Sequence, residues 1–337
     1  MATLKDIARA AGVSIATVSN VVNGTKPATP AVRRRVLAAI ERLGYVPNPH
    51  AQSLRTGQSR TFGLVVPDLT NPFFPALVQA VETTARARGH VLIVMDAGND
   101  VERERDAMAL LASYRVAGVI WVPVDDRPAP ALPCPLVTVD RAVPGCDAVV
   151  ADHAQGGALI AAHALERGHR RIGLLSGPSL VPSAAARRAG FLTALAHHAE
   201  LAWEHEVPFS SDLPREVQRR LQRPDCSLVV CANDAIAVGV VRHARATGLR
   251  LPDDLAVTGF DDVPWADFVD PALTTVRQPL GALGARAVDL LRQRIEDPHR
   301  PAQLETLPVE LIARRSSALP RDAAAGASVD TAKGMAA

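Results

Sequence analysis

From residue 61 onward, short runs of Val, Ile and Leu alternate with longer amphipathic segments, and this rhythm constrains the fold more than any other feature. The first apolar runs are TFGLVVPD, HVLIVMDAG, AGVIWVPV and PLVTVD, and the rhythm returns after Asp152 in RRIGLLSGP, SLVVCAND and LAVTGFDD. Continuous apolar strands that alternate with helices are typical of parallel sheets covered on both faces. The sequence therefore predicts an α/β body with two similar lobes.

The chain of 337 residues exceeds what one hydrophobic core serves, so we expect more than one domain. Its composition is that of an ordinary globular protein, and no apolar run approaches the roughly 20 residues of a membrane span. The first residues show no signal-peptide pattern, which predicts a cytoplasmic protein. Four cysteines lack CxxC or zinc spacing, which predicts reduced thiols and no metal site: Cys134, Cys146, Cys226 and Cys231.

Charge is distributed unevenly along the chain. Residues 1–60 hold nine Lys and Arg against two acidic residues, a net charge of +7, whereas the remainder holds 28 against 33, a net charge of −5. A basic head on an acidic body is typical of a small nucleic-acid-binding module attached to a larger domain. A solvated basic tail would give the same charge, so the two explanations have to be separated by the pattern of the head.

The head contains three amphipathic segments. The first has apolar residues at helical spacing: Leu4, Ile7, Ala8 and Ala11. Gly12 can then turn the chain and Ser14 can cap a second helix, whose inward side chains are Val18, Val21 and Val22. A third helix from Pro30 to Leu43 completes the core with Val32, Val36, Ile40 and Leu43. This pattern predicts a helix-turn-helix module of three helices.

The runs TLKDIARAAGVSIATVSNVVNG and GYVPNPHAQSLRTG resemble the N-terminal head of the lactose-repressor (LacI/GalR) family of bacterial transcription regulators. The resemblance implies that the second helix enters the major groove of DNA, where small side chains allow close approach. By position it assigns base reading to Ile15, Ala16 and Asn20, and phosphate contacts to Thr3, Ser14, Thr17, Ser19 and Asn23. A head that only docks another protein is the alternative, which the basic charge disfavours.

The resemblance also identifies residues 48–55 as a hinge helix that folds on DNA. It implies that Leu54, next to Arg55, inserts into the central minor-groove step and kinks the duplex. An ordinary buried leucine is the alternative for Leu54. Residues 57–59, with the sequence Gly-Gln-Ser, then form a linker into the body.

Polar and aromatic residues follow the predicted strands of the body. Ligands of open parallel sheets bind beyond the carboxyl ends of the strands, so these residues are candidates for a binding site. They are Asp68, Asn71, Phe73, Phe74, Asp140, Arg141, Arg187, Asn233, Asp234, Asp261 and Asp262. Carboxylates, an amide, guanidinium groups and aromatic faces suit a polyhydroxylated ring, which predicts a sugar or a related small metabolite as the ligand.

The family resemblance extends through the body to about Ser317 and implies a core similar to the periplasmic sugar-binding fold. It assigns effector contacts to Phe73, Phe74, Arg187, Asn233 and Asp261, and less securely to Ser183 and Phe209. Purine-responsive members carry an arginine where Val181 stands, which disfavours a purine effector. Each residue also has a structural alternative: Asn233 and Asp261 can cap helices or anchor loops, Arg187 can pair with a carboxylate, and aromatic residues can pack the lobes.

No GxSxG, GxxxxGK[ST], HExxH or GxGxxG motif occurs in the sequence, so an enzyme is not supported. We expect a DNA-binding repressor without cofactor that acts as a homodimer on a palindromic operator and responds to a sugar-like effector. A sugar-binding transport receptor is the alternative, disfavoured by the head. The expected domains are the DNA-binding head (1–47), hinge and linker (48–60), the effector-binding and dimerisation core (61–317), and a disordered tail (318–337).

Overall fold

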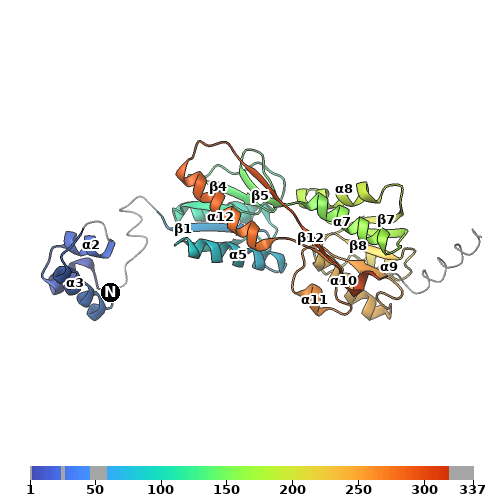
Figure 1. Cartoon of the computed structure of the whole chain (residues 1–337), viewed down its shortest axis with the longest axis horizontal. Coiled ribbons are helices and arrows are strands. Elements are labelled where there is room, and N and C mark those ends of the chain that lie inside the picture. Colours follow the sequence, from blue (N-terminus) through green and yellow to red (C-terminus); the bar gives the residue numbers. More distant parts are fainter. Residues whose placement is uncertain (1, 24–26, 46–58, 319–337) are drawn as a thin grey trace, which may run out of the picture. The chain divides into compact units, whose positions relative to one another are not determined.

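The computed structural model describes residues 2–23, 27–45 and 59–318, and its contacts divide the chain into two compact units, residues 1–60 and 61–337 (Figure 1). Within the described residues, no helix has both the length and the apolar character needed to cross a membrane. All four cysteines are free thiols; Cys226 and Cys231 are buried and the other two are half-buried, as predicted.

The first unit contains three helices, as predicted: α1 (Leu4–Ala11), α2 (Ile15–Asn23) and α3 (Pro30–Leu43). Gly12 ends α1 with a φ of 62°, a left-handed conformation that glycine adopts without strain and that turns the chain toward α2. Ser14 Oγ then accepts a hydrogen bond from the Thr17 backbone N–H, at 3.1 Å, and caps α2. The core of the unit consists of Ile7, Ala8, Ala11, Val18, Val36 and Ala39.

One predicted core residue of the head is wrong, because Leu43 is 37% exposed. Ala39 is buried in its place, and Tyr45, which follows the left-handed turn at Gly44, packs against the same core. The core is therefore closed by the residue after the turn, and the last helical leucine is left at the surface.

The first lobe of the second unit is a parallel sheet of six strands in the order β11-β5-β4-β3-β1-β2. Alternate residues of a strand face opposite sides, so Phe62, Leu64 and Val66 contact one helical layer while Val65 contacts the other. The strands are β1 (Thr61–Val66), β2 (Val91–Asp96), β3 (Gly118–Trp121), β4 (Leu136–Val139), β5 (Asp147–Ala151) and β11 (Leu304–Leu307). Helices α5 (Phe73–Ala87) and α12 (Leu280–Glu296) cover one face, and α6 (Val101–Ser113) covers the other.

The second lobe is a parallel sheet of four strands in the order β7-β6-β8-β9. The strands are β6 (Arg171–Ser176), β7 (Glu200–Glu206), β8 (Leu228–Cys231) and β9 (Ala256–Thr258). Helices α7 (His153–Glu166) and α8 (Pro182–Leu195) cover one face, and α9 (Arg215–Leu221) and α10 (Asp234–Thr247) cover the other. The remaining elements are the short helix α11 (Trp265–Phe268), the antiparallel pair β10 (Thr275–Arg277) and β12 (Glu310–Ile312), and the 3-10 helix Arg315–Ser317.

The two lobes are interleaved in the sequence, which the strand rhythm alone does not predict. The chain leaves the first lobe after β5, returns to it with α12 and β11, and crosses again to β12. In Figure 1 the orange helix α12 accordingly lies among the cyan and green elements of the first lobe. The crossovers are held together by a hydrogen bond of 2.8 Å from the Asp152 N–H to the Leu307 carbonyl.

Candidate functional site

The head presents a helix surface with small side chains. Ile15 is 48% exposed, Ala16 is exposed, and Thr17, Ser19 and Asn20 are half-buried, whereas Val18 of the same helix is fully buried. Thr3 and Ser14 act as helix caps: Thr3 forms a capping box with Asp6, and Ser14 caps α2. Asn23 is the last residue of α2, and Leu54 and Arg55, with the rest of the predicted hinge, lie outside the described residues.

All seven predicted effector residues line a single cavity of the second unit. Residues from both lobes contribute, because the cavity lies at the carboxyl ends of strands from both sheets. The lining consists of Asn71, Phe73, Phe74, Asp140, Arg141, Ser183, Arg187, Phe209, Asn233 and Asp261. Most of the predicted strand-end residues therefore converge on one cavity, and the part that each residue plays in binding stays a prediction.

Arg187 and Asp261 form the polar centre of this cavity. Arg187 Nη2 lies 3.2 Å from Asp261 Oδ1, and Arg187 Nη1 donates to the Ala232 carbonyl at 2.8 Å. Burial raises the pKa of Asp261 to about 6, although Arg187 and a hydrogen bond from Gln278 Nε2 act to lower it. Asp261 also has a φ of 110°, a strained conformation for a non-glycine residue.

Asp140 and Arg141 form a second charged pair, on the side of the first lobe. Arg141 Nε lies 3.6 Å from Asp140 Oδ2, and Arg141 Nη1 donates to the carbonyls of Pro123 and Val124. Within the described part of the chain, neither Asp140 Oδ1 nor Arg141 Nε has a hydrogen-bond partner, although both atoms are buried. A buried acceptor and a buried donor without partners are costly unless something else binds them.

The segment that holds Arg141 is fixed by a buried glutamate. Glu104 on α6 accepts hydrogen bonds from Trp121 Nε1 at 2.9 Å and from the Val124 N–H at 2.8 Å. Burial raises the pKa of Glu104, and these two donors partly oppose that shift. Glu104 thereby fixes the backbone whose carbonyls orient Arg141.

His153 belongs to this cluster but was not predicted from the sequence. It is the first residue of α7 and is 6% exposed. Its Nδ1 lies 3.3 Å from Arg187 Nε, and its Nε2 lies 3.2 Å from the Asp140 carbonyl oxygen. Burial and the neighbouring Arg187 lower the pKa of His153 to about 4, so the imidazole is neutral at physiological pH.

Several cavity residues also have a structural role, as the alternatives predicted. Asn233 Oδ1 accepts a hydrogen bond from the Ile236 N–H and caps α10, and Phe73 and Phe74 belong to the core of the first lobe while lining the cavity. Three strand-end carboxylates do not line it. Asp68 holds its own loop through Thr70, Asp234 is buried against Thr275 and Val263, and Asp262 pairs with Arg277 and Arg314.

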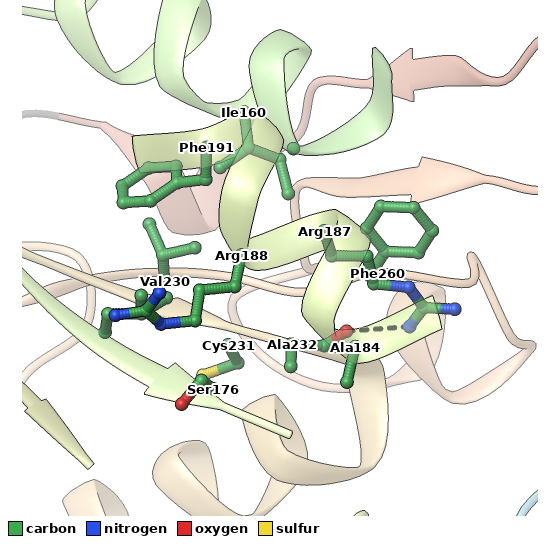
Figure 2. A pocket seen from close by; sticks show the side chains of 12 residues that line it. Ile160, Ser176, Ala184, Arg187, Arg188, Phe191, Val230, Cys231, Ala232 and Phe260 are labelled. Carbon is green, nitrogen blue, oxygen red and sulfur yellow. Dashed lines mark hydrogen bonds between the residues drawn. The ribbon is translucent and has the colours of Figure 1, made fainter. Parts of the chain in front are cut away.

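A second pocket lies in the second lobe and shares only Arg187 with the first. Figure 2 shows that Arg187 and Arg188 leave α8 in opposite directions, with the Arg187 guanidinium beside Phe260 and bonded to the Ala232 carbonyl. Arg188 instead pairs with Glu204 on β7. The other lining residues are mainly apolar, including Ile160, Phe191 and Val230, so Arg187 separates a polar cavity from an apolar one.

A helix-turn-helix head in one chain with a two-lobed core that encloses a polar cavity defines a ligand-responsive DNA-binding regulator. Comparisons with known proteins agree. Residues 3–48 match the family of bacterial regulatory proteins named after lacI, and residues 161–317 match a periplasmic binding protein-like domain. The HTH-type transcriptional repressor PurR of Photobacterium profundum is 32% identical over 331 residues, which cover 94% of this chain and 98% of the relative.

Two solved structures are also similar along nearly the whole chain. The lac repressor dimer bound to operator and the anti-inducer ONPF has a TM-score of 0.85 and 30% identity, over 94% of this chain and 99% of that one. The complex of the transcriptional regulator CelR with cellobiose has a TM-score of 0.69 and 30% identity, over 94% and 100%. The chain belongs to the lacI family. It is a ligand-responsive DNA-binding repressor and not an enzyme, as predicted.

Proposed function

We propose that this repressor works in the cytoplasm as a homodimer on a palindromic operator, and that a sugar or sugar derivative without net charge binds in the cavity of the second unit and controls it. The observation that carries the effector class is the balance of charge. The cavity contains two carboxylates, Asp140 and Asp261, and two guanidinium groups, Arg141 and Arg187, and each carboxylate lies beside one guanidinium.

A neutral polyhydroxylated ring satisfies this cavity without disturbing its charge. Its hydroxyl groups can donate to Asp140 Oδ1 and accept from Arg141 Nε, two buried atoms that have no hydrogen-bond partner within the described residues. Phe73, Phe74 and Phe209 supply apolar faces for the ring. An anionic ligand would instead leave one more negative charge than the two guanidinium groups balance, among charged side chains that are themselves buried.

The similar proteins support this effector class in part. CelR is solved with cellobiose and the lac repressor with ONPF, whereas the PurR repressors carry a name that suggests purines. Val181 stands where purine-responsive members carry an arginine, and it is an apolar, buried residue outside the cavity lining. We therefore favour a sugar.

The proposed functions belong to consecutive segments of the chain. Residues 1–47 bind DNA, with Ile15, Ala16 and Asn20 on bases and Thr3, Ser14, Thr17, Ser19 and Asn23 near phosphates. Residues 48–60 form the hinge, in which Leu54 inserts into the minor groove and Arg55 contacts DNA, residues 61–317 bind the effector and dimerise, and 318–337 form a tail. Two-fold symmetry of the dimer explains a palindromic operator, since one head reads one half-site.

A thermal-shift screen tests the effector class. Neutral monosaccharides, disaccharides, sugar acids, sugar phosphates and nucleosides are each added to the purified full chain, because a ligand at 100 times its Kd stabilises the folded state by about 2.7 kcal/mol. We expect a neutral sugar to raise Tm and the Asp261→Ala variant to lose that response while it still binds DNA. A response confined to sugar phosphates or nucleosides would overturn the proposal.

DNA binding is tested separately. The full chain is mixed at moderate salt with duplexes from the region upstream of its own and adjacent genes, and the protected sequence is mapped. We expect a palindromic site, with one half-site for each subunit. Protection of a single, non-palindromic site by one chain would contradict the dimer.

A further inference from the structure

We propose that His153 is a positioning residue that couples the ligand cavity to the crossover between the lobes. The inference rests on the proposed function, because it concerns the control of the same cavity. His153 follows directly on the first crossover: β5 ends at Ala151 in the sheet of the first lobe, and α7 begins at His153 in the second.

The imidazole contacts one cavity residue from each lobe. On the side of the first lobe, Nε2 lies 3.2 Å from the carbonyl oxygen of Asp140 and 3.6 Å from its Oδ1. On the side of the second lobe, Nδ1 lies 3.3 Å from Nε of Arg187. One side chain at the crossover therefore connects a residue that follows β4 to a residue on α8.

The partners fix the protonation of the ring. A guanidinium can only donate, so Nδ1 has to be the unprotonated acceptor and the proton lies on Nε2, where it is donated to the Asp140 carbonyl. The ring also lies tilted against Phe260, with the centroids 6.0 Å apart, and Phe260 in turn lies 3.9 Å from the Arg187 guanidinium. The imidazole is thus held in one orientation and one tautomer.

This arrangement transmits movement in either direction. Asp140 and Arg187 both line the cavity, so a sugar that binds between them changes the distance that His153 spans. The Asp152 N–H, one residue earlier, is bonded to the Leu307 carbonyl of a second crossover. A change in the arrangement of the lobes at these crossovers therefore moves Arg187 and Asp140 through their contacts with His153. Ligand binding in the cavity moves the crossovers through the same contacts.

Three variants test this role. His153→Leu keeps the bulk of the side chain but can bond to neither neighbour, whereas His153→Gln restores one acceptor for Arg187 and one donor for Asp140. His163→Leu is the matched control, because His163 lies on the same helix, is 5% exposed, and bonds to Ser317 Oγ rather than to a cavity residue.

The first measurement needs no ligand. Hydrogen exchange of the full chain is followed by mass spectrometry for peptides that cover residues 138–155. We expect His153→Leu to speed exchange there, since the Asp140 and Asp152 amides are bonded to Val149 and Leu307 beside the bridge. His153→Gln should restore most of the protection, and His163→Leu should affect residues 314–318 instead. Equal exchange at 138–155 in wild type and His153→Leu would overturn the coupling.

The second measurement uses D-ribose, D-glucose and cellobiose as probes in titration calorimetry. For a probe that binds the wild type, we expect His153→Leu to lose about 10- to 100-fold in affinity, the loss typical of a hydrogen bond to a charged group, and His153→Gln to recover most of it. Unchanged affinity in His153→Leu would overturn the inference. Failure of all three probes with the wild type counts against the proposed effector class, and the exchange data then decide the role of His153 by themselves.

Discussion

Arg187 on α8 and Asp261 after β9 form a buried ion pair with 3.2 Å between Nη2 and Oδ1. We expect the proposed sugar binding to depend on pH through this pair. Burial raises the pKa of Asp261 to about 6. Above that pH the carboxylate is ionised and can accept two hydroxyl hydrogen bonds, and below it the group becomes protonated and loses that capacity. We expect the affinity for a neutral sugar to be full above pH 7 and about tenfold weaker at pH 5.

The check is titration calorimetry at both pH values with wild type and with Asp261→Asn. The asparagine has the same shape but does not titrate, so its weaker affinity should be the same at both pH values. His153, with a pKa of about 4, stays neutral in this range and does not contribute. An equal pH effect in both proteins would assign the dependence to another group.

The sequence was sufficient to predict elements whose ends carry local signals. The third helix has its predicted bounds, Pro30–Leu43, because Thr29 caps it, Pro30 suits its first turn and Gly44 ends it in a left-handed conformation. The cavity residue Asp261 was also predictable, because it follows the apolar strand β9 closely, whereas Arg187 lies on α8, beyond the end of β6. The rule that ligands bind beyond the carboxyl ends of parallel strands can be applied once the strands are predicted from the sequence, without knowledge of the tertiary structure.

Features that depend on tertiary structure were not predictable. His153 contacts the cavity residues Asp140 and Arg187 only because the chain crosses between interleaved lobes at that point. The strand rhythm gives no signal for Phe209, because this residue follows β7, a half-exposed edge strand whose sequence ELAWEHE lacks the continuous apolar pattern. The exposure of Leu43 likewise follows from Tyr45 packing on the head core after the turn, which helical periodicity does not report.

Leu54 provides a prediction for the head and hinge. If it inserts between base pairs, Leu54→Ala removes the wedge, and specific operator affinity should fall while most non-specific binding, which depends on phosphate contacts, is kept. Electrophoretic mobility shifts with the operator and with a scrambled duplex measure both quantities. Leu43→Ala, which truncates a surface leucine of the head, is the control. Unchanged operator affinity in Leu54→Ala would refute the wedge.

Gly157 allows α7 and α8 to approach closely beneath Arg187. A Cβ atom at residue 157 would lie 2.1 Å from the Arg187 carbonyl oxygen, so Gly157→Ala forces the two helices apart. We expect a loss of about 1–3 kcal/mol in the free energy of unfolding, together with weaker sugar binding because the backbone of Arg187 moves. Chemical denaturation of the full chain and the thermal-shift response to sugar measure the two effects.

The control for Gly157 is Gly281→Ala in the first turn of α12. A Cβ there meets no atom within 4 Å in the described structure, so the substitution should leave stability unchanged or raise it by up to about 1 kcal/mol through helix propensity. If both alanine variants lost the same amount of stability and sugar binding, the close approach of α7 and α8 would not explain the effect of Gly157→Ala.

His169 makes the stability of the second lobe depend on pH. It is fully buried, its Nδ1 lies 2.9 Å from Ser227 Oγ, and its Nε2 lies 3.3 Å from the Ser317 carbonyl. His169 therefore connects the residue before β8 to the 3-10 helix Arg315–Ser317. Burial lowers its pKa from 6.5 to about 4. Between these values the unfolded chain binds a proton that the folded protein does not, so the stabilisation present above pH 6.5 is lost as the pH falls toward 4.

The size of this effect follows from the linkage, at about 1.4 kcal/mol for each pH unit, or about 2 kcal/mol between pH 6.5 and 5. His169→Gln lacks the titration, so the stability difference between wild type and variant should shrink by that amount from pH 7.5 to pH 5. Urea denaturation at the two pH values measures it. Parallel pH curves for wild type and His169→Gln would show that His169 does not titrate on unfolding.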